Sequence, residues 1–139
     1  MTSIERITQN GINYAEIIWA DTQVEHSTFF SAPESSFQFG LLAHKAGFVE
    51  SAHWHKSIPR TISNLHQMFV VQKGVVVVEF YDANRTLFKE VTLRRGDAIL
   101  LMDGIHAIRV VEDMQCVSVK QGPFLGAEND KIPVDKTGQ

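Results

Sequence analysis

Two histidines separated by a single residue, His53 and His55, are the first side chains in this sequence whose types and spacing suggest chemistry. On a β-strand, residues two apart project from the same face. Both imidazoles therefore face one side, and the intervening Trp54 faces the other. Imidazole is a good ligand for zinc, copper, iron and nickel, so the pair is a candidate for half of a metal site.

A third histidine and a glutamine complete the candidate set. His106 follows a glycine turn and opens an apolar strand, and Gln67 opens another strand. In an antiparallel barrel these two positions can converge with the histidine pair in the interior. Three nitrogens and one oxygen complete a first shell with space left for water or substrate. We therefore expect His53, His55, Gln67 and His106 to bind a divalent transition metal such as Zn, Fe, Ni or Mn.

The elements that must position these residues are short strands separated by turns. Between residues 67 and 120, apolar segments rich in β-branched residues recur with turn sequences about every 8 to 12 residues, which is typical of an all-β sandwich or barrel. The predicted strands are Gln67–Gln72, Val75–Tyr81, Thr86–Leu93, Ala98–Met102, Ile105–Val111 and Met114–Lys120.

The first half of the chain is less regular. We predict strands over Tyr14–Trp19, Phe37–His44 and Val49–His55, with a turn at residues 45–47. The segment Ile4–Gln9 is either a short helical turn or a frayed arm. The chain then divides into an N-terminal arm (1–36) whose strand joins the barrel or a dimer, a barrel (37–124) and an exposed C-terminal tail (125–139).

Length and composition are those of one soluble domain. The chain has 139 residues, of which 44% are hydrophobic and 21% charged, and its net charge is −3. This balance, without a basic stripe, argues against a nucleic-acid partner. The single cysteine, Cys116, allows no intrachain disulfide. The polar N-terminus lacks a signal peptide, and no apolar run approaches the roughly 18 residues of a membrane helix, so we expect a cytoplasmic protein without a membrane partner.

Two glycine-flanked motifs resemble those of the cupins. The first cupin motif is a Gly, five residues, His-x-His, a short gap, a Glu, six residues and a Gly. Here five residues separate Gly47 from His53-Trp54-His55, and six residues separate Gln67 from Gly74.

The second cupin motif is a Gly, five residues, Pro-x-Gly and a His, and Gly96, Met102-Asp103-Gly104 and His106 follow that pattern. The resemblance extends from about Phe37 to Lys120. It implies a double-stranded β-helix, or jelly-roll barrel, with the metal ligands inside.

The sequence departs from these motifs at three places. Gln67 replaces the usual Glu, Met102 replaces the usual Pro, and the gap over 56–66, which contains Pro59, is longer than typical. This gap is either a cover for a bound ligand or simply a longer surface connection. Without a carboxylate, the metal charge stays uncompensated, so we expect an anionic ligand such as a carboxylate, a phosphate or an enolate. Alternatively, Gln67 only holds a metal-bound water.

Two further side chains are candidates for substrate binding. Arg60, in the inserted loop, is a candidate anion contact, and it ranks above Arg109, whose odd spacing from His106 places it on the outer face of its strand. Tyr81 or the preceding Phe80 should line the barrel. Glu79 is a candidate general base only if its strand directs it inward.

The remaining histidines are weaker candidates. His66 points to the face opposite Gln67 and would replace it as a ligand only if the register shifts by one residue. His26 and His44 have no spacing partner and are assigned to the surface or the core.

The C-terminal segment Val117–Gly126, with Asp130-Lys131 beyond it, resembles the signature of small cupins associated with polysaccharide and nucleotide-sugar biosynthesis. The resemblance implies a carbohydrate ligand. The leading hypothesis is a metal-dependent isomerase or epimerase-like enzyme acting on a sugar or sugar acid. The alternatives are a non-haem iron dioxygenase and a non-catalytic module that binds a sugar or an organic acid. We also expect a homodimer, in which Ile12–Trp19 adds a strand to the partner's sheet edge.

Overall fold

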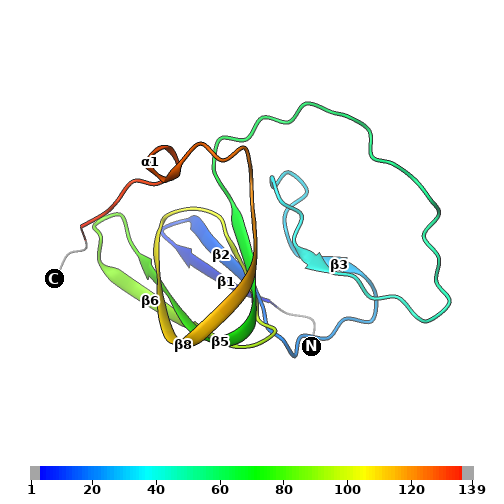
Figure 1. Ribbon diagram of the computed structural model, residues 1–139, viewed down its shortest axis with the longest axis horizontal. Helices are drawn as coiled ribbons and strands as arrows, with labels where there is room; N and C mark the ends of the chain where they lie inside the picture. The colour runs from blue at the N-terminus through cyan, green and yellow to red at the C-terminus, as the bar shows by residue number, and fades with distance from the viewer. Residues whose placement is uncertain (1–3, 136–139) are drawn as a thin grey trace.

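The computed structural model describes residues 4–135, and its regular structure is almost entirely β (Figure 1). Strands account for 44% and helix for 3% of the structure, so the all-β prediction is confirmed. The elements are β1 (Glu5–Gln9), β2 (Ile12–Ile18), β3 (Thr28–Phe29), β4 (Gly40–Leu41), β5 (Gln67–Tyr81), β6 (Leu87–Leu93), β7 (Ala98–Leu101), β8 (Ile105–Lys120) and α1 (Ala127–Asp130).

Six of the strands form one antiparallel sheet in the order β1-β2-β7-β5-β6, with β8 pairing β5 along its length. The sheet curls strongly and forms half of a barrel (Figure 1). Strands β3 and β4 form a separate two-stranded ribbon beside it. The N-terminal strands therefore belong to the main sheet, and β2 lies between β1 and β7 with neighbours on both sides.

The helical turn or frayed arm expected at the N-terminus is instead the strand β1. Its hairpin with β2 turns at Asn10 and Gly11, whose φ values are 51° and 76°. Positive φ at both central residues is the signature of the type I′ turn, for which Asn-Gly is the preferred sequence. Because β2 is enclosed by β1 and β7, the predicted addition of its edge to a partner's sheet is also wrong in this structure, whereas the homodimer itself stays a prediction.

Two of the breaks expected between strands are bulges inside long strands. Residues 73–74 lie within β5, and residues 112–113 lie within β8. The register between these strands shifts three times between Val71 and Val76. Gly74 has a φ of 87°, and a Cβ there would lie 2.1 Å from the Asp113 carbonyl oxygen, so the glycine permits close contact between the strands. Such bulges increase the local twist and help the sheet to curl.

The main core lies on the inner face of the curled sheet. Its largest side chains are aromatic, and the ring of Tyr14 makes edge contacts with Phe80 and Phe88 at centroid distances of 6.1 and 5.1 Å. Inward-facing residues of β5, including Val76 and Val78, are fully buried beside them. The alternation of apolar residues along each strand produces this inner face, because successive side chains point to opposite sides.

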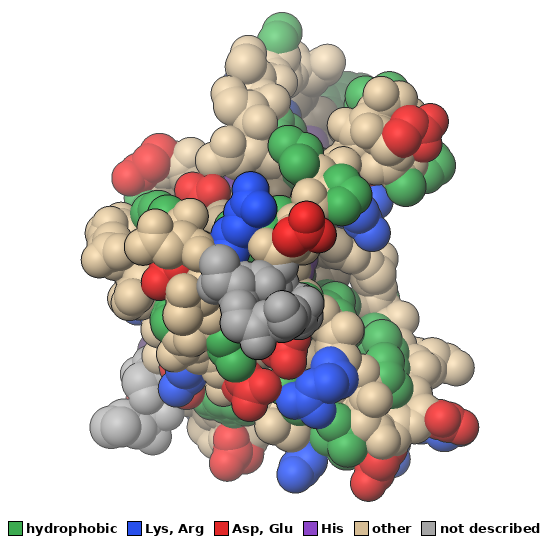
Figure 2. All heavy atoms as spheres, turned by 90° about the vertical axis from the view of Figure 1, so that its left-hand side faces the viewer, with side chains coloured by type: hydrophobic (Ala, Val, Ile, Leu, Met, Phe, Trp, Pro, Cys, Tyr) green, Lys and Arg blue, Asp and Glu red, His purple; other side chains and the backbone are tan. Residues whose placement is uncertain are grey.

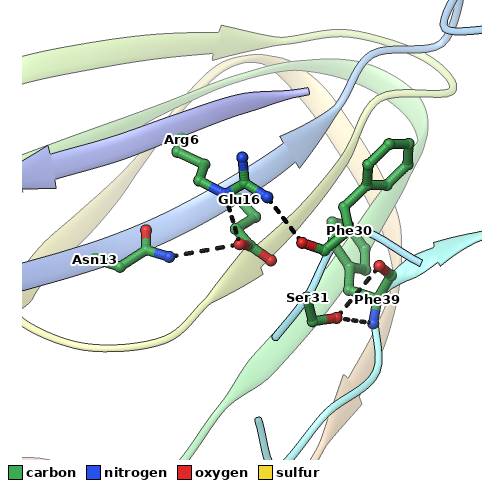
Figure 3. A network of polar contacts seen from close by, with 6 residues as sticks. All are labelled: Arg6, Asn13, Glu16, Phe30, Ser31 and Phe39. Carbon is green, nitrogen blue, oxygen red and sulfur yellow. Dashed lines mark hydrogen bonds and ion pairs between the residues drawn. The ribbon is translucent and has the colours of Figure 1, made fainter. Parts of the chain in front are cut away.

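Around β2 and β7, the outer face of the sheet is covered by the segment that carries β3 and β4. Ile18, Phe39 and Leu100 form a second buried cluster there. Polar contacts hold the layers together (Figure 3): Arg6 Nε donates to Glu16 Oε2 at 3.0 Å and Arg6 Nη2 donates to the Phe30 carbonyl at 2.7 Å.

The segment between β4 and β5, residues 42–66, extends away from the sheet as an exposed loop, and only His66 at its end is buried (Figure 1). The strand predicted over Phe37–His44 is reduced to β4, and the strand predicted over Val49–His55 does not form in this structure. Apolar alternation is sufficient to predict these strands, but a strand also needs a hydrogen-bonded neighbour, which this segment lacks.

The predicted C-terminal tail includes the short helix α1, and Lys120 connects to it through an ion pair with Asp130 at 3.4 Å. The part of the tail over 136–139 lies outside the described residues. Figure 2 shows Lys and Arg side chains interspersed with Asp and Glu on the face that lies to the left in Figure 1. Charges of mixed sign are typical of a solvated surface.

Candidate functional site

His106 lies on the inner face of the sheet, near the start of β8. It pairs directly with Phe80, and residues directly opposite in an antiparallel pair share a face. The turn before it is fixed by Gly104, which has a φ of 76°, and a Cβ at that position would overlap the ring of Tyr14. The glycine therefore allows the strand to start close against the core, which sets the direction of the imidazole.

The environment of His106 favours the neutral imidazole. Its side chain is exposed to solvent, but it projects into the curl, where burial removes part of its hydration. This desolvation lowers its pKa from the usual 6.5, and the positive charge of Lys131 lowers the pKa further. The neutral ring keeps a lone pair for a metal ion or for a hydrogen-bond donor, so the position suits the predicted role.

Gln67 lies on the same inner face, at the opposite end of β5. It is two residues from the buried Phe69, and its Nε2 donates to Ser118 Oγ at 3.0 Å. This hydrogen bond uses the amide nitrogen and orients the side chain, while the carbonyl oxygen is the atom suited to a metal or a water. The sequence analysis missed Ser118 as a residue of this face. Its place on the inner face follows from the register, in which it lies opposite Phe69.

His53 and His55 lie on the exposed segment 42–66. Their rings approach edge to face, with centroids 5.3 Å apart. His53 Nδ1 lies 2.7 Å from the Ser51 carbonyl oxygen, and its Nε2 lies 3.7 Å from Glu50 Oε1. Trp54 is 91% exposed. The two imidazoles are therefore neighbours, as their spacing predicts, but they contact only their own segment.

The four predicted ligands are thus divided between two parts of the molecule. His106 and Gln67 belong to the inner face of the sheet, whereas the histidine pair belongs to the exposed segment. Within residues 4–135, no group of three or more His, Cys, Asp or Glu side chains is arranged to hold a metal ion. The arrangement in this structure therefore does not fit a bound metal. A site of all four ligands requires the exposed segment to lie against the inner face of the sheet.

His66, the substitute ligand, has a structural role on the outer side of the sheet. Its side chain is nearly buried; its Nδ1 lies 3.0 Å from Ser36 Oγ, and its ring packs edge-on against Phe37. Desolvation lowers its pKa, against a weaker raising effect of the Asp103 and Glu16 charges. The structure therefore buries this histidine instead of directing it toward Gln67.

The other candidates are also dispersed. Arg60 lies on the exposed segment and donates to the Ile58 carbonyl at 3.3 Å. Tyr81 donates through its hydroxyl to Glu79 Oε1 at 2.9 Å, and Arg109 lies 3.4 Å from the same carboxylate. Arg109 thus lies on the outer face, as expected, and so does Glu79.

The remaining two histidines lie away from the inner face. His44 stacks on Phe48 at a centroid distance of 3.8 Å, within the exposed segment. The His26 carbonyl accepts a hydrogen bond from Thr28 Oγ1 at 2.8 Å. Neither contact suggests a role in the site.

No family model matches the chain, and neither the curated proteins nor the solved structures contain a significant match. Among the described residues, no helix has the length and apolar character needed to cross a membrane.

Proposed function

We propose that this chain binds one divalent transition metal ion through His53, His55 and His106, inside a cupin-like jelly-roll barrel. Gln67 is the fourth ligand or the anchor of a metal-bound water. The observation that carries the proposal is the position of His106 with Gln67 on the inner face of the curled sheet, with a neutral imidazole in a concave surface.

The glycines of the two motifs add support. The four positions all have positive φ, a conformation that glycine adopts without strain: Gly47 (93°), Gly74 (87°), Gly96 (90°) and Gly104 (76°). The spacing of the motifs thus coincides with backbone positions that require glycine.

We further propose that the ligand is a small anion, such as a carboxylate or phosphate group on a carbohydrate. Imidazole and amide ligands are neutral, so the metal charge is balanced by whatever binds next to it. On the outer face, Glu79 is engaged with Arg109 and Tyr81. Its position away from the inner face removes it as a general base and favours the binding function over isomerase activity.

Elemental analysis of the purified protein tests the metal site directly. We expect about one equivalent of a transition metal in the wild type and a loss of most of it in His53→Ala and in His106→Ala. His26→Ala is the matched control, because that residue lies outside the proposed set, and it should retain the metal. Wild-type protein without stoichiometric metal, or equal metal content in all variants, would contradict the proposal.

A further inference from the structure

The last residue of β8, Lys120, presents an ammonium group to the inner face of the sheet. It pairs directly with Gln67, and residues directly opposite in an antiparallel pair share a face. Ser118, whose hydroxyl accepts from Gln67 Nε2 at 3.0 Å, lies two residues earlier on the same face. One end of the inner face therefore brings together a positive charge, an amide and a hydroxyl.

The C-terminal tail turns back from the end of β8 and reaches this ammonium group (Figure 1). Asp130 Oδ2 lies 3.4 Å from Lys120 Nζ, and the same nitrogen lies over the ring of Phe124 at a centroid distance of 5.3 Å. The side chain of Asp130 is only 11% exposed and that of Lys120 is 29% exposed. Among the described residues, both side-chain interactions of the Lys120 ammonium are thus with the tail.

The same part of the tail also acts on the other end of the inner face. Lys131 follows Asp130 directly, and its charge lowers the pKa of His106, which lies at the opposite end of β8 from Lys120. Two consecutive tail residues therefore carry charges that act on both ends of the face. The tail brings a carboxylate to the end where Gln67 lies, although the sheet itself supplies none there.

Apart from this contact, the tail is held only lightly. Helix α1 has four residues, none of them buried, and a helix this short is not stable by itself. Phe124 and Leu125 are 71% and 60% exposed, so they bury little apolar surface. An ion pair between partly exposed side chains adds little stability, because solvent screens the charges and ordering the side chains costs entropy. Release of the tail from Lys120 therefore needs little free energy.

We infer that Lys120 binds the carboxylate of a small organic ligand, and that the Asp130 carboxylate occupies this position until the ligand displaces it. The inference deepens the proposed function and rests on it for a ligand that is a small anion. A ligand carboxylate gains the same charge-assisted contact that Asp130 makes. The amide of Gln67 and the hydroxyl of Ser118 can both bond to hydroxyl groups, so a hydroxylated acid such as a sugar acid fits this end of the face.

Titration with acetate in the presence of a chelator tests the displacement of Asp130. Acetate carries the same group as an aspartate side chain, and the NMR signals of amides 118–131 report its binding at constant ionic strength. Asp130→Asn should bind acetate about three to five times more tightly than the wild type, because the competing carboxylate is gone. Glu128→Gln removes a negative charge from the same helix and is the matched control, with wild-type affinity.

Substitution of Lys120 tests the contact itself. Lys120→Gln should weaken acetate binding by at least about tenfold, because it removes a charge-assisted hydrogen bond. Lys120→Arg keeps the positive charge and should retain binding, which separates loss of the charge from loss of the fold. Lys73→Gln, at an exposed lysine of β5, is the control for the change in net charge and should bind as the wild type does.

Equal acetate affinities of Asp130→Asn and the wild type would overturn the inference, because Asp130 would then be only a structural partner of Lys120. Unchanged binding in Lys120→Gln, or no binding to Asp130→Asn, would overturn it as well. The expected pattern in a protein that elemental analysis finds without metal would support the inference and refute the proposed metal site. Stoichiometric metal together with acetate binding that does not depend on Lys120 would refute the inference and leave the metal site.

Discussion

The inner face of the sheet has two regions that differ sharply in burial although their residues are similar. One is the core, where β5 lies with β2, β6 and β7, and the other is β8. Val76 of β5 is fully buried in the core, whereas Val110, directly opposite it on β8, is 51% exposed. The next inward pair, Val78 and Ile108, shows the same contrast. Strands β2, β6 and β7 supply the partners that bury the first region, and β8 has neighbours on one side only. An apolar side chain on the inner face is thus buried only where a second layer faces it.

The largest expected effect on stability comes from truncating one large apolar side chain in each region. Phe80→Ala removes a fully buried ring from the core and should destabilise the protein by about 3–5 kcal/mol, through lost burial and a residual cavity. Ile108→Ala, on the same face, should cost about 1 kcal/mol, because its side chain is partly exposed. Urea unfolding followed by circular dichroism measures both, and equal costs would show that β8 is as well covered as the core.

The covered outer face should give the next largest effect. Arg6→Ala leaves the buried carboxylate of Glu16 without its cationic partner, and we expect a loss of about 2 kcal/mol in the free energy of unfolding. Arg6→Lys retains a positive charge and is the matched control, with a smaller loss. A neutral effect of Arg6→Ala in the same unfolding assay would mean that Glu16 finds another partner or is protonated.

A smaller effect concerns the ligand preference of the inner face. Gln67→Glu introduces a negative charge beside the proposed metal and should weaken the binding of inorganic phosphate by about tenfold, or about 1.4 kcal/mol. Titration calorimetry with phosphate measures the change, while elemental analysis should find the metal retained. Gln115→Glu, on the outer face, is the control for added charge. Tighter phosphate binding in Gln67→Glu would contradict an electropositive site.

The smallest effect is a dependence of stability on pH that both regions share. The pKa values of His66 and His106 are lowered from 6.5 in the folded protein, so the unfolded chain binds more protons once the pH falls toward that value. Stability should therefore be complete above about pH 7.5 and decrease as the pH falls through 6.5 and below. Urea unfolding at a series of pH values measures this decrease.

His66→Gln should reduce this dependence more than His26→Gln, because His66 is buried and His26 is exposed. If both variants reproduce the wild-type pH profile, burial of His66 does not contribute to it.

Several features could be predicted from local sequence. The alternation of apolar residues identifies β6 and β7, and the glycine spacing coincides with the positions of positive φ. The Asn10-Gly11 pair is a local signal for the β1–β2 hairpin, which the sequence analysis missed. The positions of His106 and Gln67 in the alternation of their strands also predict the face that they share, because successive side chains point to opposite sides.

The rest depends on which strands become neighbours. The residues around Gly74 favour a turn locally, but pairing with β8 makes them a bulge in one continuous strand. Whether Glu79 points inward follows from the register with β6 and β8, and the His53-Trp54-His55 segment has a strand pattern without a partner in this structure. Local sequence thus determined the conformations and faces that each segment prefers. Only the tertiary structure decided which of those preferences found a partner, because hydrogen bonding and burial between strands involve residues far apart in the chain.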